Sequence, residues 1–180
     1  MITHILAAAI GIVVLILSII ISVSHNNIWG VVTGSIYGGL YIVMYSISST
    51  YHGLKPGLGK KVMQVIDHCT IYLMIAGTYT PILLSGIRPV YPVLAWVIFG
   101  IEWALVAFAV VFTAIDHIKY RKLSMICYIG MGWASILGIK PIIDNMPKMG
   151  VVFLVLGGVL YTVGIIFYAL KKFRYMHCVW

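Results

Sequence analysis

The chain has few charged residues, few cysteines and no polar stretch long enough to form a soluble domain. Only 9% of its 180 residues are charged, whereas 62% are hydrophobic. A soluble domain needs polar surface to cover its core, and this composition leaves too little polar surface for that. The three cysteines are scattered along the chain, which excludes a disulfide framework and a paired-cysteine metal motif. The short segments of alternating polarity that build a membrane β-barrel are also missing.

The sequence consists instead of apolar runs of about 20 residues, the length that a helix needs to cross a bilayer. We predict an all-α, multi-spanning bundle that forms a single integral-membrane domain over residues 1–180. A seventh helix begins near Met176 and stops at Trp180. The six complete spans are predicted at about residues 3–24, 29–54, 62–85, 90–115, 123–140 and 149–170.

The basic residues are distributed unevenly between the loops on the two sides of the predicted bundle. The loops after the second, fourth and sixth spans hold Lys55, Lys60, Lys61, Lys119, Arg121, Lys122, Lys171, Lys172 and Arg174. The remaining loops hold only Arg88, Lys140 and Lys148. Cytoplasmic loops carry the excess of Lys and Arg, so we predict a plasma-membrane protein with a cytoplasmic N-terminus. The net charge of +8 is explained by this bias and does not indicate nucleic-acid binding.

Small residues and one proline predict how the spans pack and bend. Gly30, Gly34 and Gly38 recur at every fourth position of the second span, as Gly130, Ala134 and Gly138 do in the fifth. Such stripes let helix backbones approach closely in lipid, and we interpret them as packing faces within the bundle. Pro81 is expected to bend the third span, with the hydroxyls of Thr78 or Thr80 meeting the freed carbonyls.

Four chemically active side chains are predicted to lie at one depth, near the cytoplasmic surface. Ser48 and His52 are four residues apart, so they share one face of the second helix. Asp67 stands several residues into the third helix, and His177 opens the seventh; both helices start from the cytoplasmic side. This convergence follows from a topology that was based on Lys and Arg alone.

Two imidazoles and a carboxylate at one depth suit Zn²⁺, which takes nitrogen and oxygen donors. His52 and His177 are the candidate metal ligands. With one ligand position open, a zinc-bound water becomes a nucleophile near neutral pH. Asp67 can orient that water or accept its proton. Ser48 can donate a hydrogen bond to a substrate carbonyl or contact the water.

Each of these side chains also has a simpler interpretation. A lone histidine near a helix end is usually an interfacial residue, and that applies to His52 and to His177 when each is taken alone. His68 follows Asp67 directly and points about 100° away from it, so it is a neighbour of the site rather than a ligand. We interpret His4 and His25, which flank the first span, as interface residues.

The acidic residues within or near the spans differ in what they indicate. Asp67 indicates a functional site more strongly than either histidine alone, because an acid inside a span marks such a site by default. Glu102 lies in the middle of the fourth span and is expected to face the bundle interior, against a Trp or Tyr donor that the local pattern does not identify. Asp116 and His117 fall beyond that span and are expected to be solvated.

Three segments together resemble the bacterial haemolysin III proteins, relatives of the adiponectin and progestin receptors. The segments are SSTYHGL from residue 48, IDHCTIYLMIAGTYTP from residue 66 and KKFRYMHCVW from residue 171. The resemblance implies a seven-helix fold from a wider group, which includes the alkaline ceramidases, of metal-dependent hydrolases. It also implies a Ser-x-x-x-His motif, matched by Ser48 and His52, and an Asp in the third helix, matched by Asp67.

The same resemblance implies a His-x-x-x-His pair that opens the seventh helix. His177 matches the first histidine of the pair, and the second would stand one position beyond Trp180. We expect the sequence to be a fragment that lacks this span; the alternative is a reduced site with two histidines and Asp67 as ligands. The start of the sequence also looks clipped, because the family has a short polar segment ahead of its first helix.

Three functions stay open at this point. The first is a zinc-dependent hydrolase that acts on an amide or ester of a lipid-like substrate. The second is a sensor or regulator of the membrane state, in which the zinc is structural. Pore formation ranks last, because a pore needs a polar lining through the whole bilayer, and apart from Glu102 the charges stand at one end. The expected partners are membrane lipid and a lipid-like substrate, and the sequence does not indicate an oligomeric state.

Overall fold

The computed structural model describes residues 2–169, and in this part of the chain every regular element is a helix. The helices are α1 (Ile2–Ser24), α2 (Ile28–Gly53), α3 (Leu58–Pro81), the π-helix η1 (Ile82–Ile87), α4 (Pro92–Asp116), α5 (Arg121–Gly132), the 3₁₀ helix η2 (Ala134–Gly138), α6 (Ile139–Asn145) and α7 (Lys148–Ala169). Six helical segments among the described residues are long and apolar enough to cross a membrane. The predicted all-α bundle with six complete spans is therefore confirmed. The predicted start of a seventh helix near Met176 lies outside the described residues.

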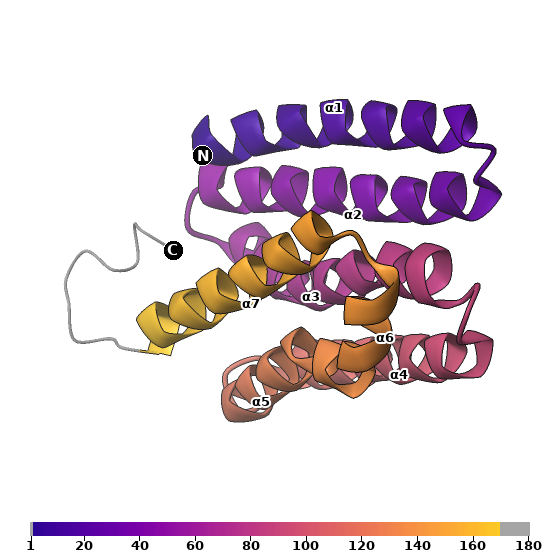
Figure 1. Ribbon diagram of the computed structural model, residues 1–180. Coiled ribbons are helices and arrows are strands. Elements are labelled where there is room, and N and C mark those ends of the chain that lie inside the picture. Colours follow the sequence, from indigo (N-terminus) through magenta and orange to yellow (C-terminus); the bar gives the residue numbers. More distant parts are fainter. Residues whose placement is uncertain (1, 170–180) are drawn as a thin grey trace.

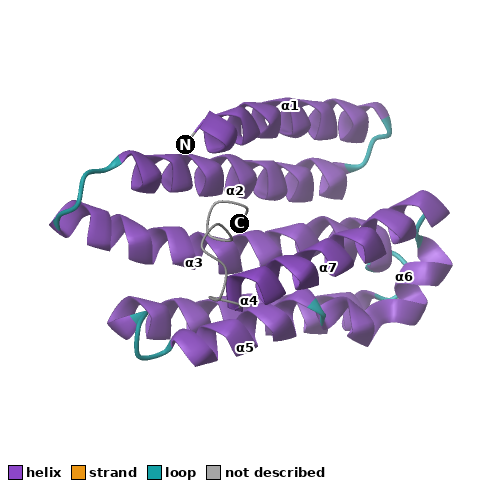
Figure 2. Ribbon diagram, turned by 90° about the vertical axis from the view of Figure 1, so that its left-hand side faces the viewer, coloured by secondary structure: helices purple, strands orange, loops and turns teal. Residues whose placement is uncertain are grey.

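Successive spans run in opposite directions and are joined by short loops. Helices α1 to α4 stack one beside the next, and α7 crosses obliquely in front of α3 (Figure 1). The loop between α2 and α3 therefore lies at the end of the bundle where α1 begins (Figure 2). We call this end, where α1 begins, α2 ends and α3 begins, the polar end, and the opposite one the far end.

Glycines on α2 let α1 approach its backbone closely, as predicted. A Cβ atom at Gly38 would lie 2.8 Å from the Cβ of Leu15 on α1, and one at Gly34 would lie 3.0 Å from the Oγ of Ser18. The corresponding prediction for the fifth span is wrong at Gly130. No atom of another described helix lies within 4 Å of the position that a Cβ at Gly130 would take, so Gly130 is not at a close helix contact in this part of the chain.

The third span continues past its proline instead of breaking. From Ile82 to Ile87 the chain follows a π-helix, the wider turn that commonly appears as a local bulge in α-helices. The hydroxyls of Thr78 and Thr80 donate to the carbonyls of Met74 and Ala76. The carbonyl that Pro81 frees, four residues earlier, belongs to Gly77, so the expected pairing with these hydroxyls is wrong.

The fifth span is not one continuous helix. α5 ends at Gly132, a 3₁₀ turn follows, and α6 continues to Asn145, five residues beyond the predicted end at 140. Trp133 ends α5 in a non-helical conformation, with its N–H bonded to the carbonyls of Ile129 and Met131. Pro141 falls within the first turn of α6, where its missing N–H needs no helical partner.

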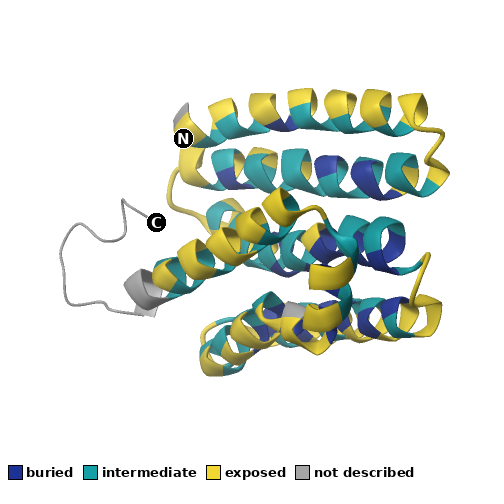
Figure 3. Cartoon of the chain, viewed as in Figure 1, coloured by how far each residue is buried: buried dark blue, intermediate teal, exposed yellow. Residues whose placement is uncertain are grey.

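The core consists of two apolar clusters, one between α3, α4 and α5 and the other between α3, η1, α4 and α6. Tyr72, Val106 and Met131 belong to the cluster nearer the polar end, and Leu83 and Ile98 to the one nearer the far end. By contrast, α1 and α7 expose most of their large apolar side chains (Figure 3). Exposed apolar surface of this extent is what a membrane-spanning helix presents to lipid.

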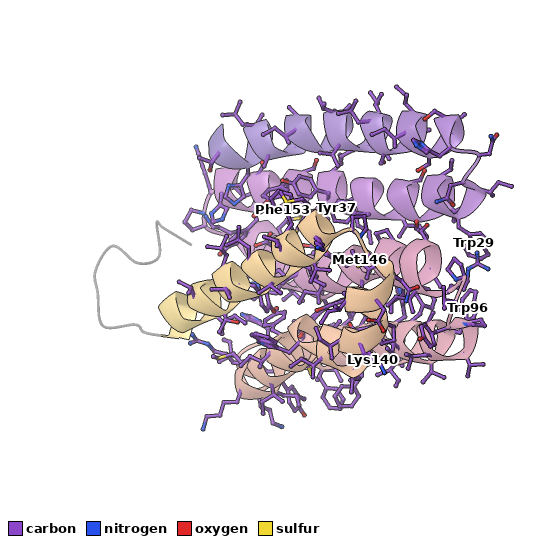
Figure 4. The ribbon with its side chains drawn as sticks, in the orientation of Figure 1. Trp29, Tyr37, Trp96, Lys140, Met146 and Phe153 are labelled. Atoms are coloured by element: carbon purple, nitrogen blue, oxygen red, sulfur yellow. The ribbon has the colours of Figure 1, made fainter. Side chains whose placement is uncertain are left out.

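Aromatic side chains gather at the far end of the bundle. Trp29 at the start of α2 and Trp96 near the start of α4 lie with their ring centroids 6.0 Å apart (Figure 4). The guanidinium of Arg88 lies over the ring of Trp29, at 4.2 Å from its centroid. Tryptophan and snorkelling arginine are typical of the membrane–water interface, so this end of the bundle lies at one bilayer surface.

Candidate metal centre at the polar end

The structure places Ser48 and His52 on the last two turns of α2, at the polar end. Ser48 is buried, whereas His52 is exposed. The ring of His52 lies beside that of Tyr51, with centroids 4.9 Å apart, and beside that of His4 from α1. The predicted Ser-x-x-x-His arrangement is thus a helical one, with the imidazole one turn nearer to the membrane surface than the hydroxyl.

His4 is the residue of this site that the sequence did not indicate. Its ring centroid lies 5.2 Å from that of His52 at an interplanar angle of 63°, and 5.9 Å from that of Tyr45 at 72°. Its Nδ1 lies 3.1 Å from the hydroxyl of Thr3. The prediction of an interfacial role concerned only its place near a helix end. The topology could have indicated that His4 lies near His52, because α1 begins at the same end of the bundle at which α2 finishes.

Asp67 lies more than two turns into α3, which begins at Leu58, and it is half-buried. Its carboxylate and the imidazole of His4 interact electrostatically, and its backbone carbonyl accepts a hydrogen bond from Thr70 Oγ1 at 2.7 Å. The rings of His4 on α1 and His52 on α2 lie against each other, and Asp67 on α3 stands at the same end of the bundle. His177 lies outside the described residues.

A second pair of histidines lies on the other side of α3. The ring of His68 is 6.1 Å from that of His117, and its Nδ1 lies 2.7 Å from the carbonyl of Gln64. His68 therefore points towards the end of α4, away from the site, as the helical spacing predicted. Asp116 is exposed and accepts hydrogen bonds from the backbone N–H groups of Ile118 and Lys119, which stabilises the turn between α4 and α5.

The donor atoms at the polar end fit zinc in chemical type but do not complete its coordination. Imidazole nitrogen and carboxylate oxygen are the donors that zinc takes, usually four in number. Within residues 2–169, no three His, Cys, Asp or Glu side chains are grouped so that they could hold a metal ion by themselves. His4 and His52 are two such donors in contact with each other, and Asp67 stands at the same end of the bundle, so the described residues offer only a partial donor set.

Glu102 forms a separate polar feature in the middle of the bundle. It stands on the inner face of α4, between buried residues of both core clusters, and is only 1% exposed. Neither of its carboxylate oxygens has a hydrogen-bond partner in the described part of the chain. The prediction that it faces the interior is confirmed, and the expected Trp or Tyr donor is not found among residues 2–169. Tyr161 on α7 interacts with it electrostatically and donates its hydroxyl to Tyr128 instead.

An apolar cavity of about 340 Å³ lies between α3, α5 and α7. Its lining includes Ile75, Tyr79, Trp133, Leu154, Gly158 and Tyr161. None of the lining residues belongs to the polar end, so this cavity and the histidine site are distinct.

Comparison with known proteins agrees with this architecture over the whole sequence. A family model described as "Haemolysin-III related" matches residues 1–180. The chain belongs to the haemolysin III-related family. As a member of this family with six membrane-crossing helices, it is a multi-pass integral membrane protein.

Three relatives show how far the similarity extends. The chain is 36% identical to "Hemolysin-3" of Bacillus cereus, over 99% of this chain and 80% of that protein. It is 34% identical to "Hemolysin-3 homolog" of Bacillus subtilis, over 99% of this chain and 83% of the relative. It is 24% identical to the human "Monocyte to macrophage differentiation factor", over 86% of this chain and 65% of the human protein. No solved structure matches the chain.

Proposed function

We propose that this haemolysin III-related protein is a zinc-dependent hydrolase-like membrane protein that acts on an amide or ester bond of a lipid-like substrate. The observation that carries the proposal is that His52, on the last turn of α2, and Asp67 of α3 stand at the same end of the bundle, where His52 is exposed. An imidazole and a carboxylate at one end of the bundle, at the depth where a headgroup meets its acyl chains, suit hydrolysis of an amphiphile.

The proposed ligands are His52 and His177, and each of the other site residues has a role of its own. When bound, zinc polarises a carbonyl oxygen and acidifies a bound water. Asp67 orients the attacking water and accepts its proton, since its half-buried carboxylate stands at the same end of the bundle as His52. Ser48, one turn deeper than His52, donates its hydroxyl to the substrate carbonyl and so fixes the scissile bond at one depth.

We place the polar end on the cytoplasmic side of the plasma membrane, with the N-terminus cytoplasmic. The loop residues Lys55, Lys60 and Lys61, and Lys119, Arg121 and Lys122, all lie next to this end, whereas Arg88, Lys140 and Lys148 lie towards the far end. An excess of basic residues is characteristic of cytoplasmic loops. The substrate bond would then be reached from the inner leaflet.

The test compares Asp67→Asn with Asp144→Asn, a matched change at an exposed position of α6. Both variants are purified in full length, assayed for bound zinc and offered amide and ester lipids with a fluorescent acyl chain. We expect Asp67→Asn to keep its zinc and to lose turnover by about 10²- to 10⁴-fold, since a general base contributes that much. Asp144→Asn should behave as wild type. Turnover by Asp67→Asn within about threefold of wild type would reject the catalytic role.

A structural zinc in a sensor or regulator of the membrane is the second candidate. One observation favours it: the partial donor set comes from three different helices, so a metal held there would tie α1, α2 and α3 together. This function predicts that Asp67→Asn leaves signalling intact while His52→Ala lowers stability, because metal binding is coupled to folding.

Pore formation, which the names of the two Bacillus relatives suggest, is the weakest candidate. A conducting pore needs polar or charged side chains along its whole length. On α4 the buried stripe is apolar except for Glu102 and Thr113, and both core clusters close around it. The bundle interior described here is packed rather than lined for ions.

A further inference from the structure

We propose that His4 of α1 is a ligand of the same divalent cation as His52, and thus that the first helix contributes directly to the metal centre. This inference rests on the metal site of the proposed function and adds a residue to it. Neither the sequence motifs nor the proposed reaction assigns His4 a part, although its ring lies against that of His52.

The separation of the two rings is the first argument. Two imidazoles that bind one tetrahedral zinc through nitrogens at about 2 Å have their ring centroids about 5 Å apart. The centroids of His4 and His52 are 5.2 Å apart, at an angle of 63°. The rings are tilted rather than stacked, which lets a nitrogen of each point to a common position.

The second argument is the hydrogen bond of His4 to its neighbour. Metal-binding histidines nearly always use one ring nitrogen for the metal and the other for an oxygen partner, which fixes the ring orientation. The Nδ1 of His4 lies 3.1 Å from Thr3 Oγ1, so Nε2 is the nitrogen left for a cation. The ring of Tyr45, at 5.9 Å and 72°, supports the imidazole from the side.

The third argument is the charge beside the pair. The Asp67 carboxylate stands at the same end of the bundle and acts on the His4 imidazole as the smallest of several electrostatic effects, so it adds a negative charge to the surroundings of the pair. The histidine pair on the other side of α3 is arranged differently. Its rings are 6.1 Å apart, and the neighbouring Asp116 carboxylate already accepts two backbone hydrogen bonds. His117 is therefore a matched control.

The experiment loads the purified full-length protein with Zn²⁺ or Co²⁺ alone and measures metal stoichiometry and affinity by competition with a chelator. The variants are His4→Gln, His52→Gln and His117→Gln. We expect one metal per wild-type chain, a loss of affinity of about 10²-fold or more in the first two variants, as removing metal-site partners produces, and no change in the third. Circular dichroism shows whether each variant keeps its helices.

A second variant makes the result independent of stability. His4→Cys offers a thiolate at the same place, and thiolate is a good ligand for these metals. The Co²⁺ form of His4→Cys should gain a sulfur-to-cobalt absorption band in the near ultraviolet, beyond any band of the wild type. A Co²⁺-loaded His4→Cys protein without an added band overturns the inference, and so does a His4→Gln affinity within about threefold of wild type.

These outcomes separate the inference from the function on which it rests. When His52→Gln loses the metal and His4→Gln keeps it, only the role of His4 is rejected. When the wild type binds no metal at all, the zinc centre of the proposed function is rejected together with it.

Discussion

Two parts of the bundle hold ionisable side chains within the spans, and they differ in what surrounds those side chains. At the polar end, His4, His52 and Asp67 come from three helices, and the rings of the two histidines lie against each other at the border of the membrane. In the middle of the bundle, Glu102 stands alone between two apolar clusters, with both carboxylate oxygens unpaired in the described part of the chain.

The difference lies in what it costs to keep these ionisable groups inside the bundle. Burying an ionisable group without a hydrogen-bond partner is costly, and that cost is offset only by a function or by surrounding packing. The two histidines and Asp67 avoid most of this burial cost, because His52 is exposed and Asp67 and His4 are half-buried. Glu102 bears the whole cost, and no second donor group faces it from the described residues.

The largest expected effect concerns metal at the polar end. Zinc at about 1,000 times its Kd should stabilise the wild-type protein by about 4 kcal/mol, because the metal binds only the folded chain. His52→Ala should lose this stabilisation, since it removes a proposed ligand. Thermal unfolding in detergent, with and without zinc, measures the difference.

The control for this experiment is His25→Ala, which changes an exposed histidine in the loop between α1 and α2, at the far end. It should keep the full zinc-dependent shift. An equal shift in His52→Ala and in wild type would remove the contrast between the polar end and the rest of the bundle.

A smaller effect of opposite sign is expected in the middle of the bundle. Glu102→Met should raise the free energy of unfolding by about 1–3 kcal/mol, because a side chain of similar size replaces a buried carboxyl that has no hydrogen-bond partner. Chemical unfolding monitored by circular dichroism is the measurement. A destabilised Glu102→Met would indicate that the carboxyl has a partner outside residues 2–169, and Glu102 would then resemble the polar end.

The smallest effect concerns a polar residue on the same stripe of α4 that does have a partner. Thr113 lies 3.1 Å from the buried hydroxyl of Tyr72. Thr113→Val keeps the shape but leaves that hydroxyl unpaired, so the free energy of unfolding should fall by about 1 kcal/mol. The same unfolding assay tests it, with Tyr72→Phe/Thr113→Val as the double variant that should recover part of the loss. A neutral Thr113→Val would mean that the hydrogen bond contributes nothing.

Much of the fold could be predicted because a membrane-spanning helix can be recognised from the hydropathy of its own residues. Each span is a run of apolar residues, and the predicted bounds for the second span, 29–54, differ by one residue from those of α2. The packing of Gly38 against α1 also followed from spacing alone. The break of the fifth span after Gly132 did not, because Trp133 and the residues after it remain apolar and hydropathy does not distinguish a 3₁₀ turn from an α-helix.

The candidate site was predictable to a similar extent. Ser48, His52 and Asp67 could be assigned to one end because helix spacing and the charge of the loops determine depth. His4 could not be assigned, since its relevance depends on which face of α1 packs against α2. Likewise, the sequence showed that Glu102 must face inward but not that it would find no hydrogen-bond partner among residues 2–169.

The sequence by itself determined the six spans, their alternation across the bilayer and the depth of the ionisable side chains, because hydrophobic length and loop charge act on each segment separately. The tertiary structure alone decided which of those side chains meet. Helix rotation and close packing, set by contacts such as that of Gly38 with Leu15, turn His4 towards His52 and enclose Glu102 between apolar clusters. Contacts between residues so far apart in sequence have no local signature.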